Sequence, residues 1–343
     1  MQESVRVAAV QAESVPLDLA GGVDKVIALI AEAAAAGAEL VAFPETFLPG
    51  YPWWVWFDSV AAGMAYVPQY AANSMTRDGP EMKRIRQAAA EHGTHVVLGF
   101  SERDGGSLYM AQAFISAAGD LIGVRRKLKP THVERTVFGE GDGSDLQVHD
   151  TVLGKLGALN CWEHLQPLVK YAMYSQGEEI HVASWPSFAG NRESARAFGP
   201  EVNTAASMLY AVEGQVFVVA PCAVTGAATI ETYCDTEAKR QMLQLGGGFA
   251  RIYGPEGSPL AEPLPETAEG ILYADLPAFL VAIAKSCADP VGHYSRPDVL
   301  RLWINPYPNP RVITAARQEL PTPMSGERPA APEGRLVTEP TGP

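Results

Sequence analysis

Apolar residues recur along this chain in two alternating patterns, short unbroken runs and longer stretches with helical spacing. Val5–Val10 is an apolar run typical of a buried strand, and apolar residues then repeat at helical spacing until the pattern ends at Gly37. Leu40–Phe43 is the next run. The same order returns from Pro80, where a second helical pattern begins and leads to the run Thr94–Phe100. The chain therefore predicts alternating strands and helices, which is typical of α/β proteins.

Turn residues further along the chain predict that the sheet is mixed. The runs Ala111–Ser116 and Leu121–Arg126 flank Ala118-Gly119-Asp120, a turn that favours a hairpin of antiparallel strands. Beyond it the alternation of strands and helices continues. We expect strands at Leu153–Asn160, Ile180–Ser184, Val216–Ala220, Gly248–Tyr253 and Gly270–Ala274, and helices at 163–176 and 200–213, the latter with Val202, Ala205, Ala206, Leu209 and Val212 on one face.

No repeat and no linker interrupts this pattern, so we expect a single domain over residues 1–313. From about Thr314 the composition turns to Pro, Gly, Glu and Arg without a period, which predicts a disordered tail over 314–343. The chain has 343 residues, of which 47% are hydrophobic and 19% charged, in the range of globular proteins with a sizeable core.

The charge and cysteine patterns narrow the class of protein. The formal net charge is −13 and the basic residues are scattered, so neither a nucleic acid nor an anionic membrane surface is the expected partner. The longest apolar stretch, Leu276–Ala284, is shorter than the roughly 18 residues that a membrane span needs, and no signal peptide follows Met1. The four cysteines lack CxxC spacing and the histidines lack an HExxH motif. We expect a soluble cytoplasmic protein without a metal site.

Three polar side chains follow predicted strands, where α/β sheets carry their ligands. Glu45 follows LVAF, Lys127 follows LIGVRR, and Cys161 follows LGALN. Taken singly, each has a plain structural explanation: a surface carboxylate, a solvated strand end and a small buried hydrophobic residue. Together they form a chemical unit, because a thiol needs a base to become a nucleophile and the resulting anion needs a cation. The helix expected after Cys161 would favour a thiolate through its N-terminal amides.

The stretches FPETFLPGYP, RRKLKPTHVER and LNCWEH around these residues resemble, in this order, the three signature stretches of the nitrilase superfamily. The resemblance runs from about Val5 to Tyr307, and GGGFARI and GHYSRPDVLRL narrow it to the nitrilase branch. It implies an α/β fold, the αββα four-layer sandwich of two mixed sheets flanked by helices. It also implies that Glu134 is a second active-site glutamate, the alternative being a surface charge beside Arg135.

The Glu-Lys-Cys set is shared with amidases and carbamoylases, so by itself it implies only a hydrolase of carbon–nitrogen bonds. The residues CWE at Cys161–Glu163 resemble the nitrile-hydrolysing branch. We expect hydrolysis of an organic nitrile, whether aliphatic, arylaliphatic or aromatic, to the carboxylic acid and ammonia without a metal or organic cofactor. The alternatives are an amidase, a carbamoylase or a cyanide-hydrolysing member of the superfamily, and more distantly a catalytically silent assembly protein.

The expected mechanism uses each motif residue in one role. Cys161 attacks the nitrile carbon to give a thioimidate and later a thioester, with Glu45 moving the protons. Lys127 and the backbone amide of Trp162 hold the tetrahedral intermediate, and Glu134 helps to place Lys127. The pocket should be largely apolar, and its aromatic residues serve either the substrate or packing. The aromatic candidates are Tyr51, Trp53, Trp54, Trp162, Trp185 and Phe188.

The resemblance also has implications for assembly. It implies a homodimer that packs helical faces across a two-fold axis, and larger microbial relatives build open spirals from such dimers through added loops. Trp53–Asn73 and Ala223–Gln244 look like such additions, since the second is too long for an ordinary strand connection. Heterologous contacts of this kind need not close, so we expect a polydisperse spiral rather than one fixed oligomer.

Overall fold

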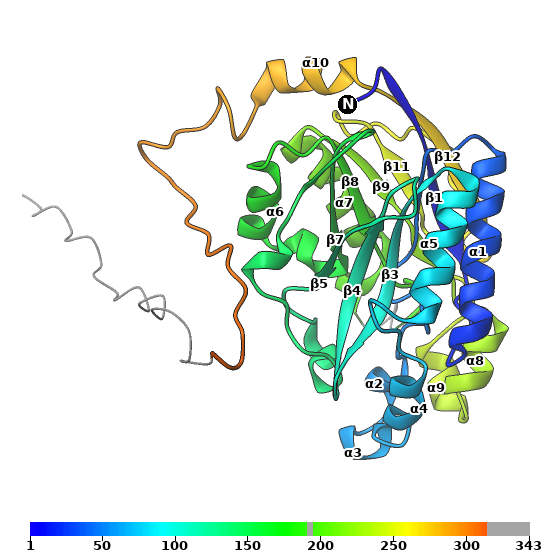
Figure 1. The fold of residues 1–343 in the computed structure, drawn as a ribbon. Coiled ribbons are helices and arrows are strands. Elements are labelled where there is room, and N and C mark those ends of the chain that lie inside the picture. The colour runs from blue at the N-terminus through cyan, green and yellow to red at the C-terminus, as the bar shows by residue number, and fades with distance from the viewer. Residues whose placement is uncertain (191–194, 314–343) are drawn as a thin grey trace, which may run out of the picture. The chain divides into compact units, whose positions relative to one another are not determined.

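The computed structural model describes residues 1–190 and 195–313 (Figure 1). Met1–Tyr307 form one compact unit, which ends before residue 313, the limit expected from composition. The described residues from Pro308 to 313 fall outside this unit. The tail expected over 314–343 lies outside the described residues.

Two mixed β-sheets form the centre of the compact unit. In the larger sheet the order is β10-β1-β2-β3-β4-β5, and β12 pairs with β1 in antiparallel orientation. In the smaller sheet the order is β11-β9-β8-β7-β6, with parallel pairs between β7, β8 and β9. The strands of the larger sheet are β1 (Ser4–Ala12), β2 (Leu40–Ala42), β3 (His95–Asp104), β4 (Ser107–Ile115), β5 (Leu121–Arg126), β10 (Cys222–Ala223) and β12 (Gly270–Pro277). Those of the smaller sheet are β6 (His149–Thr151), β7 (Gly154–Asn160), β8 (Ile180–Ser184), β9 (Phe217–Ala220) and β11 (Arg251–Tyr253).

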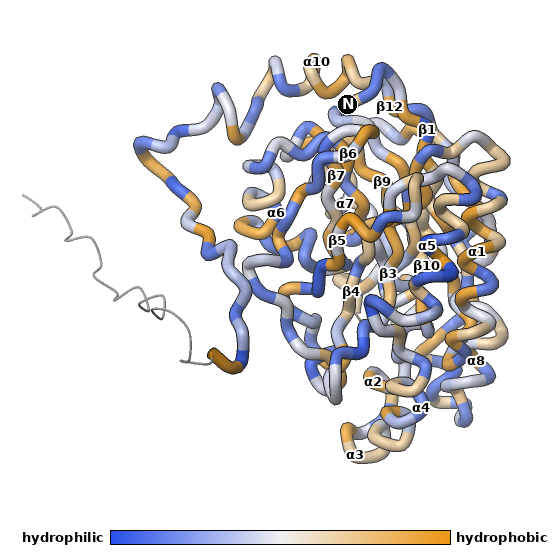
Figure 2. Tube along the Cα trace, in the orientation of Figure 1, coloured by the Kyte–Doolittle hydropathy of each residue, from blue (hydrophilic) through white to orange (hydrophobic). Residues whose placement is uncertain are grey.

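The alternation of side chains along β1 shows how the layers form. Val7 joins an apolar cluster that also contains Leu159 and Val182 of the smaller sheet, so this cluster lies between the two sheets. Val10 points to the opposite face and packs in a second cluster with Val26 of the helix α1 (Leu19–Ala35). Both faces of the strand are buried, which explains why its run is apolar apart from Arg6. Apolar positions gather along the interior strands in Figure 2.

Helices cover the outer faces of the two sheets. The helix α5 (Pro80–His92) lies beside α1 on the larger sheet, and α6 (Pro167–Tyr174) and α7 (Pro200–Gly214) belong to the half that contains the smaller sheet (Figure 1). Pro80 begins α5 and Gly93, with φ of 63°, ends it, both as predicted. The expected α/β sandwich of two mixed sheets flanked by helices is confirmed. The helix α10 (Phe279–Ala288) follows the last strand.

Several predicted elements have different limits in the structure, and two of them bear on the site. The strand expected to end at Phe100 continues to Asp104 and forms a long hairpin with β4, because Gly105, with φ of 59°, provides the tight turn. The helix expected over 163–176 is also wrong at its start. A 3-10 turn, η3 (Cys161–Leu165), comes first, and α6 begins only at Pro167. Cys161 therefore does not stand at the N-terminus of an α-helix.

The face predicted for α7 is also wrong. Of the predicted residues Ala206 is buried, but Leu209 and Val212 are 47% and 42% exposed. Tyr210 and Ala211, which were not predicted, are buried. Hydrophobic spacing misled the prediction because the buried side of this helix carries polar groups with buried partners, such as the Tyr210 hydroxyl. An apolar strip is thus left on the surface of α7.

The two segments expected to be additions pack against each other. The first contains α2 (Trp54–Phe57), α3 (Val60–Gly63) and α4 (Val67–Ala72), and the second contains α8 (Ala227–Tyr233) and α9 (Glu237–Met242). An aromatic cluster that includes Trp54, Tyr70 and Tyr233 joins them, and the Lys239 ammonium lies 3.0 Å from the Asp58 carboxylate. They form the lower part of the molecule in Figure 1.

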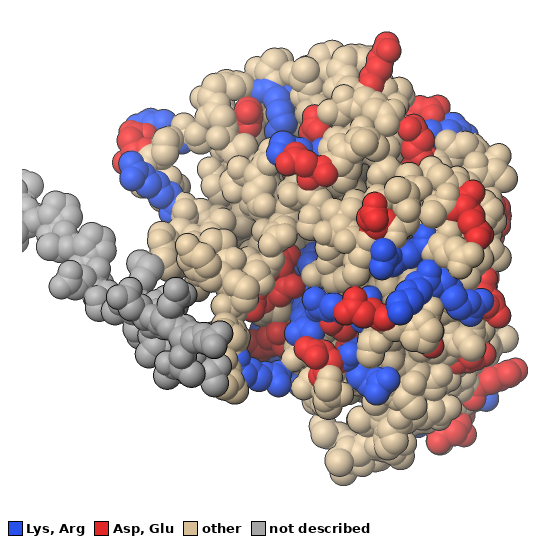
Figure 3. All heavy atoms as spheres, viewed as in Figure 1, with Lys and Arg blue, Asp and Glu red and all other residues tan. Residues whose placement is uncertain are grey.

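Acidic and basic side chains are interspersed on the face drawn in Figure 3, without a continuous basic patch. Within 1–190 and 195–313, no helix combines the length and apolar character that a membrane crossing requires.

Candidate active site

Lys127 follows β5 and lies between two carboxylates. Its Nζ donates to Glu45 Oε1 at 2.9 Å and to Glu134 Oε2 at 2.8 Å, and all three side chains are buried. Burial alone would lower the pKa of Lys127, but the charges of Glu134 and Glu45 outweigh it and raise that pKa. Lys127 is therefore a permanent cation here. We name Glu45, Lys127 and Glu134 the charged cluster.

Glu45 is the member of the charged cluster with unused hydrogen-bonding capacity. Burial raises its pKa to about 8, against the lowering effect of Lys127 and with a further raising effect of Glu134. Its Oε1 is bound to Lys127, while its Oε2 has no hydrogen-bond partner within the described part of the chain. The backbone N–H of Glu45 donates to the carbonyl of Trp185, which ties its loop to the end of β8. Glu45 can accept and return a proton near neutral pH.

Glu134, in contrast, is fully occupied. It lies on the 3-10 turn η1 (His132–Thr136), where its Oε2 also accepts from the Thr131 backbone N–H at 2.6 Å. Its Oε1 accepts from the Tyr51 hydroxyl at 2.9 Å, and the Trp56 indole donates to that same hydroxyl. These contacts fix the carboxylate as an anchor for Lys127 rather than as a proton acceptor.

Cys161 is the first residue of η3 and adopts a left-handed backbone, with φ of 47°. This conformation is strained for a residue with a side chain and is common at functional turns. Burial raises the pKa of the Cys161 thiol and the charge of Glu45 adds to it, while Lys127 and the Trp162 backbone lower it. The raising effects prevail. The protonated thiol is therefore favoured, and a base is needed to remove its proton.

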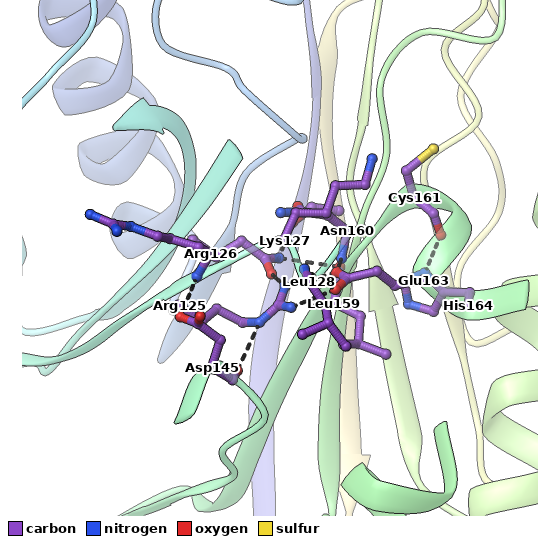
Figure 4. Close-up of polar contacts among 12 residues, drawn as sticks. Arg125, Arg126, Lys127, Leu128, Asp145, Leu159, Asn160, Cys161, Glu163 and His164 are labelled. Atoms are coloured by element: carbon purple, nitrogen blue, oxygen red, sulfur yellow. Dashed lines mark hydrogen bonds and ion pairs between the residues drawn. The ribbon is translucent and has the colours of Figure 1, made fainter. Parts of the chain in front are cut away.

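A second buried ion pair, Arg125–Glu163, fixes the segments that carry Lys127 and Cys161. Arg125 donates two hydrogen bonds to the Glu163 carboxylate, at 2.9 and 2.7 Å. That carboxylate also accepts from the backbone N–H groups of Asn160, which precedes Cys161, and Leu128, which follows Lys127 (Figure 4). Glu163 therefore joins the segment after Lys127 to the end of β7. Sequence reasoning gave this glutamate no role, although it stands within the CWE motif.

A cavity that is partly open to solvent adjoins Cys161. Cys161 and Glu134 form part of its lining, and most of the rest is aromatic. Polar contributions come from Ser187 and Asn203. The other lining residues are Tyr51, Trp53, Trp56, Thr131, Trp162, Pro186, Phe188, Gly190 and Phe198.

Comparison with known proteins decides the family. The model of the carbon-nitrogen hydrolase family matches residues 6–285. The chain belongs to this family. A nitrilase of Pseudomonas syringae is 58% identical over 91% of this chain and 93% of its own length. An aliphatic nitrilase of Rhodococcus rhodochrous is 55% identical, over 88% and 82% of the two chains. An arylacetone-specific nitrilase of Alcaligenes faecalis is 51% identical, over 88% and 85%.

Solved structures of carbon-nitrogen hydrolases show the same fold. One from Helicobacter pylori shares 18% identity over 86% of this chain and 96% of that one, with a TM-score of 0.67. An amidase of Nesterenkonia, with a covalent adduct at its active-site cysteine, shares 20% identity over 87% and 97%, with a TM-score of 0.62. The prediction of a carbon-nitrogen hydrolase of the nitrilase branch is confirmed by the sequence relatives, and its fold by these structures.

Not every aromatic candidate lies at the cavity of this hydrolase. Trp54 and Trp185 are absent from its lining, which corrects their expected place in the pocket. Trp54 packs against Tyr70 in the aromatic cluster, and the indole of Trp185 donates to Ser207. The candidates that do line the cavity are Tyr51, Trp53, Trp162 and Phe188.

Sequence reasoning missed several cavity residues, among them Trp56, Phe198 and Asn203. Trp56 belongs to the same run as Trp53, and its indole reaches the cavity through the turn of α2. Phe198 stacks on Trp162 with ring centroids 4.8 Å apart, and Asn203 accepts from the Trp162 indole at 3.0 Å. The alternation in WVWF was a usable signal for Trp56. The other two depend on how α7 packs on η3.

The hydrolase was expected to use no metal. Among the described residues, no three His, Cys, Asp or Glu side chains lie close enough together to hold a metal ion. His164, three residues after Cys161, is hydrogen-bonded to His181 and to the Cys161 carbonyl instead.

Proposed function

We propose that this protein hydrolyses organic nitriles to carboxylic acids and ammonia, with Cys161 as the nucleophile. The observation that carries the proposal is the position of Cys161 in the lining of an aromatic cavity, electrostatically coupled to a buried carboxylate with a free oxygen, Glu45. A nitrile is linear and uncharged, so such a cavity accepts it without an unpaired charge. The names of the similar proteins support the same reaction.

The first half of the reaction forms a thioimidate. Glu45 Oε2 takes the proton of the Cys161 thiol as the sulfur attacks the nitrile carbon, and one C–N π bond breaks. The nitrogen then receives that proton from Glu45. Because burial places the pKa of Glu45 at about 8, the carboxyl both accepts and releases the proton readily near neutral pH.

The second half uses two water molecules. The first adds to the thioimidate carbon, and Lys127 and the Trp162 backbone N–H hold the tetrahedral intermediate while ammonia leaves. A thioester on Cys161 remains. The second water, deprotonated by Glu45, replaces the sulfur, so the acid is released and the thiol is restored. Glu134 keeps Lys127 in place throughout.

The aromatic lining favours nitriles that carry an aryl group on a short aliphatic arm. Trp56, Trp162 and Phe198 contact one another at the cavity and offer ring faces and edges to a phenyl group. A short arm would carry the cyano group to Cys161. We expect a higher kcat/KM for phenylacetonitrile than for butyronitrile, and equal values would remove this preference from the proposal.

The proposal includes assembly through a second copy of the chain. The exposed apolar residues on α6 and α7 offer a face for a two-fold dimer, and the paired additions carrying α2–α4 and α8–α9 offer a second contact for a spiral. The described cysteines are free thiols, which suits the reducing cytoplasm that we propose as its location. Sedimentation should give species far above 36.7 kDa. The exposed apolar residues are Leu168, Met208, Leu209 and Val212.

Ammonia release from a nitrile tests the reaction. Cys161→Ala should abolish it, whereas Cys287→Ala, which alters an exposed cysteine, should retain it. The amide that corresponds to the nitrile serves as the second substrate. Efficient hydrolysis of the amide together with no reaction of the nitrile would favour the amidase alternative.

A further inference from the structure

A chain of buried hydrogen bonds lies behind Cys161, on the side of its carbonyl. His164 Nδ1 lies 2.6 Å from the Cys161 carbonyl oxygen, and His164 Nε2 lies 2.9 Å from His181 Nε2. His181 Nδ1 lies 2.6 Å from Glu178 Oε1, and the Tyr210 hydroxyl donates to Glu178 Oε2. All of these side chains are buried. We name Glu178, His181 and His164 the histidine chain.

The chemistry of the carbonyl fixes the tautomers along this chain. A carbonyl oxygen only accepts, so the proton between His164 and Cys161 belongs to His164 Nδ1. Burial lowers the pKa of both His164 and His181, so His164 is neutral and its Nε2 carries a lone pair. His181 must therefore donate from Nε2.

Glu178 and His181 then share one further proton. His181 has its first proton on Nε2, so the short contact between His181 Nδ1 and Glu178 requires a proton on one of these two atoms. Burial raises the pKa of Glu178 to about 8, which favours the neutral carboxylic acid as donor. The other charged groups that act on this pair are Lys285, near Glu178, and the Arg125–Glu163 pair, near His181. The histidine chain is thus neutral, with every hydrogen bond directed toward Cys161.

The last bond of the chain acts on the peptide that joins Cys161 to Trp162. This peptide has its carbonyl bound to His164 and its N–H on the Cys161 thiol, where it lowers the thiol's pKa (Figure 4). A hydrogen bond accepted by a peptide carbonyl fixes the plane of the peptide and strengthens its N–H as a donor. The strained backbone at Cys161 makes such a fixed plane necessary.

We propose that the histidine chain consists of positioning residues, which hold the Trp162 N–H toward the oxygen that forms on the reacting carbon. None of its members lines the cavity. The proposal deepens the proposed function, since it assumes that this N–H stabilises the tetrahedral intermediate. The hydrogen bonds and tautomers themselves do not depend on which reaction the enzyme performs.

Solid-state ¹⁵N NMR of histidine-labelled enzyme tests the tautomers directly. His164 should be protonated at Nδ1, the less common tautomer of a free imidazole, and unprotonated at Nε2, at all pH values where the enzyme is active. Loss of this signal in His164→Leu identifies it. A His164 protonated at Nε2, or at both nitrogens, overturns the proposal. The tautomer is read from the wild-type protein, and the variant serves only to assign the signal.

A matched pair of variants tests the consequence for catalysis. Asn and Leu have the same number and branching of side-chain heavy atoms, but only Asn can donate from the position of His164 Nδ1. We expect His164→Leu to lower kcat by about 10²-fold with KM nearly unchanged, as for an impaired oxyanion donor. His164→Asn should recover at least about tenfold of that loss, since it restores one hydrogen bond to the carbonyl. An equal loss in both variants, or unchanged kcat in His164→Leu, contradicts a positioning role.

The two proposals fail in distinguishable ways. A wild-type enzyme without nitrile-hydrolysing activity, yet with His164 protonated at Nδ1, would refute the proposed function alone. An active enzyme with the other tautomer would refute only the histidine chain.

Discussion

The two sides of Cys161 are built from similar residues in opposite ways. On one side, the charged cluster places two carboxylates on a single cation and leaves Glu45 Oε2 without a partner. On the other side, the histidine chain is neutral and every polar atom in it is paired. A group that moves protons needs unused capacity, whereas a group that holds geometry needs none. The difference separates a catalytic glutamate, Glu45, from a positioning glutamate, Glu178.

The largest effect is expected from removing the cation of the charged cluster. Lys127→Ala would leave Glu45 and Glu134 buried without a positive charge, so we expect no measurable turnover and a loss of about 3–5 kcal/mol in unfolding free energy. Lys127→Arg should not restore turnover, because the guanidinium differs from the ammonium in shape. Lys129→Ala, which changes an exposed lysine, is the control for kinetics and urea unfolding. Substantial activity in Lys127→Arg would make Lys127 peripheral.

A Glu→Gln substitution in the charged cluster and another in the histidine chain test the difference between the two sides of Cys161. Glu45→Gln removes the proton acceptor, and we expect kcat to fall by about 10³-fold or more. Glu178→Gln keeps a donor toward His181 and an acceptor for Tyr210, so kcat should change by no more than about threefold. Steady-state kinetics at one pH suffice. If the two variants lose activity equally, the distinction between the two sides is wrong.

Glu45 also predicts a pH dependence. Since a base must be deprotonated to act and burial raises the pKa of Glu45 to about 8, kcat/KM should rise with pH on a limb above the ordinary range of a glutamate. The raised pKa also means that the folded state binds a proton more tightly than the unfolded state. The contribution of Glu45 to the free energy of unfolding is therefore fully present below the ordinary pKa of a glutamate and is lost as pH rises toward 8. Between pH 5 and pH 8, urea unfolding should show a smaller loss of stability in Glu45→Gln than in the wild-type protein.

A smaller difference in kcat is expected between the removal of a hydrogen-bonded tyrosine hydroxyl and the removal of one without a partner among the described residues. Tyr51 donates to Glu134, whereas the buried hydroxyl of Tyr233 has no partner within the described residues. Tyr51→Phe should lower kcat by about tenfold, because Glu134 then holds Lys127 less firmly. Tyr233→Phe should leave kcat unchanged and keep or increase stability. Equal kinetic effects would show that aromatic packing, not the hydrogen bond, links Tyr51 to activity.

The charged cluster could be predicted from the sequence, and the histidine chain could not. Glu45, Lys127 and Cys161 each follow a strand, and their motifs lie in family order. His181 lies inside a strand whose apolar pattern is unremarkable, and its contact with His164 depends on the parallel register of β7 and β8. Register and side-chain direction are tertiary properties that hydrophobic spacing does not encode.

The same limit explains the errors in helices and pocket residues. Hydrophobic spacing predicted the order of nearly all strands, but it placed Leu209 inside because it could not foresee the buried hydroxyl of Tyr210. Trp54 and Trp56 are two residues apart, so they point to different sides of a short helix. Only the packing of α2 decides which one faces the cavity.

The central claim is that Cys161 carries the acyl group during turnover. The most direct measurement is mass spectrometry of peptides from enzyme quenched in acid while it hydrolyses phenylacetonitrile. We predict a thioester adduct on the peptide that contains Cys161 and none on those with Cys222, Cys234 or Cys287. An adduct on another cysteine, or sustained ammonia release by Cys161→Ala, would contradict the account.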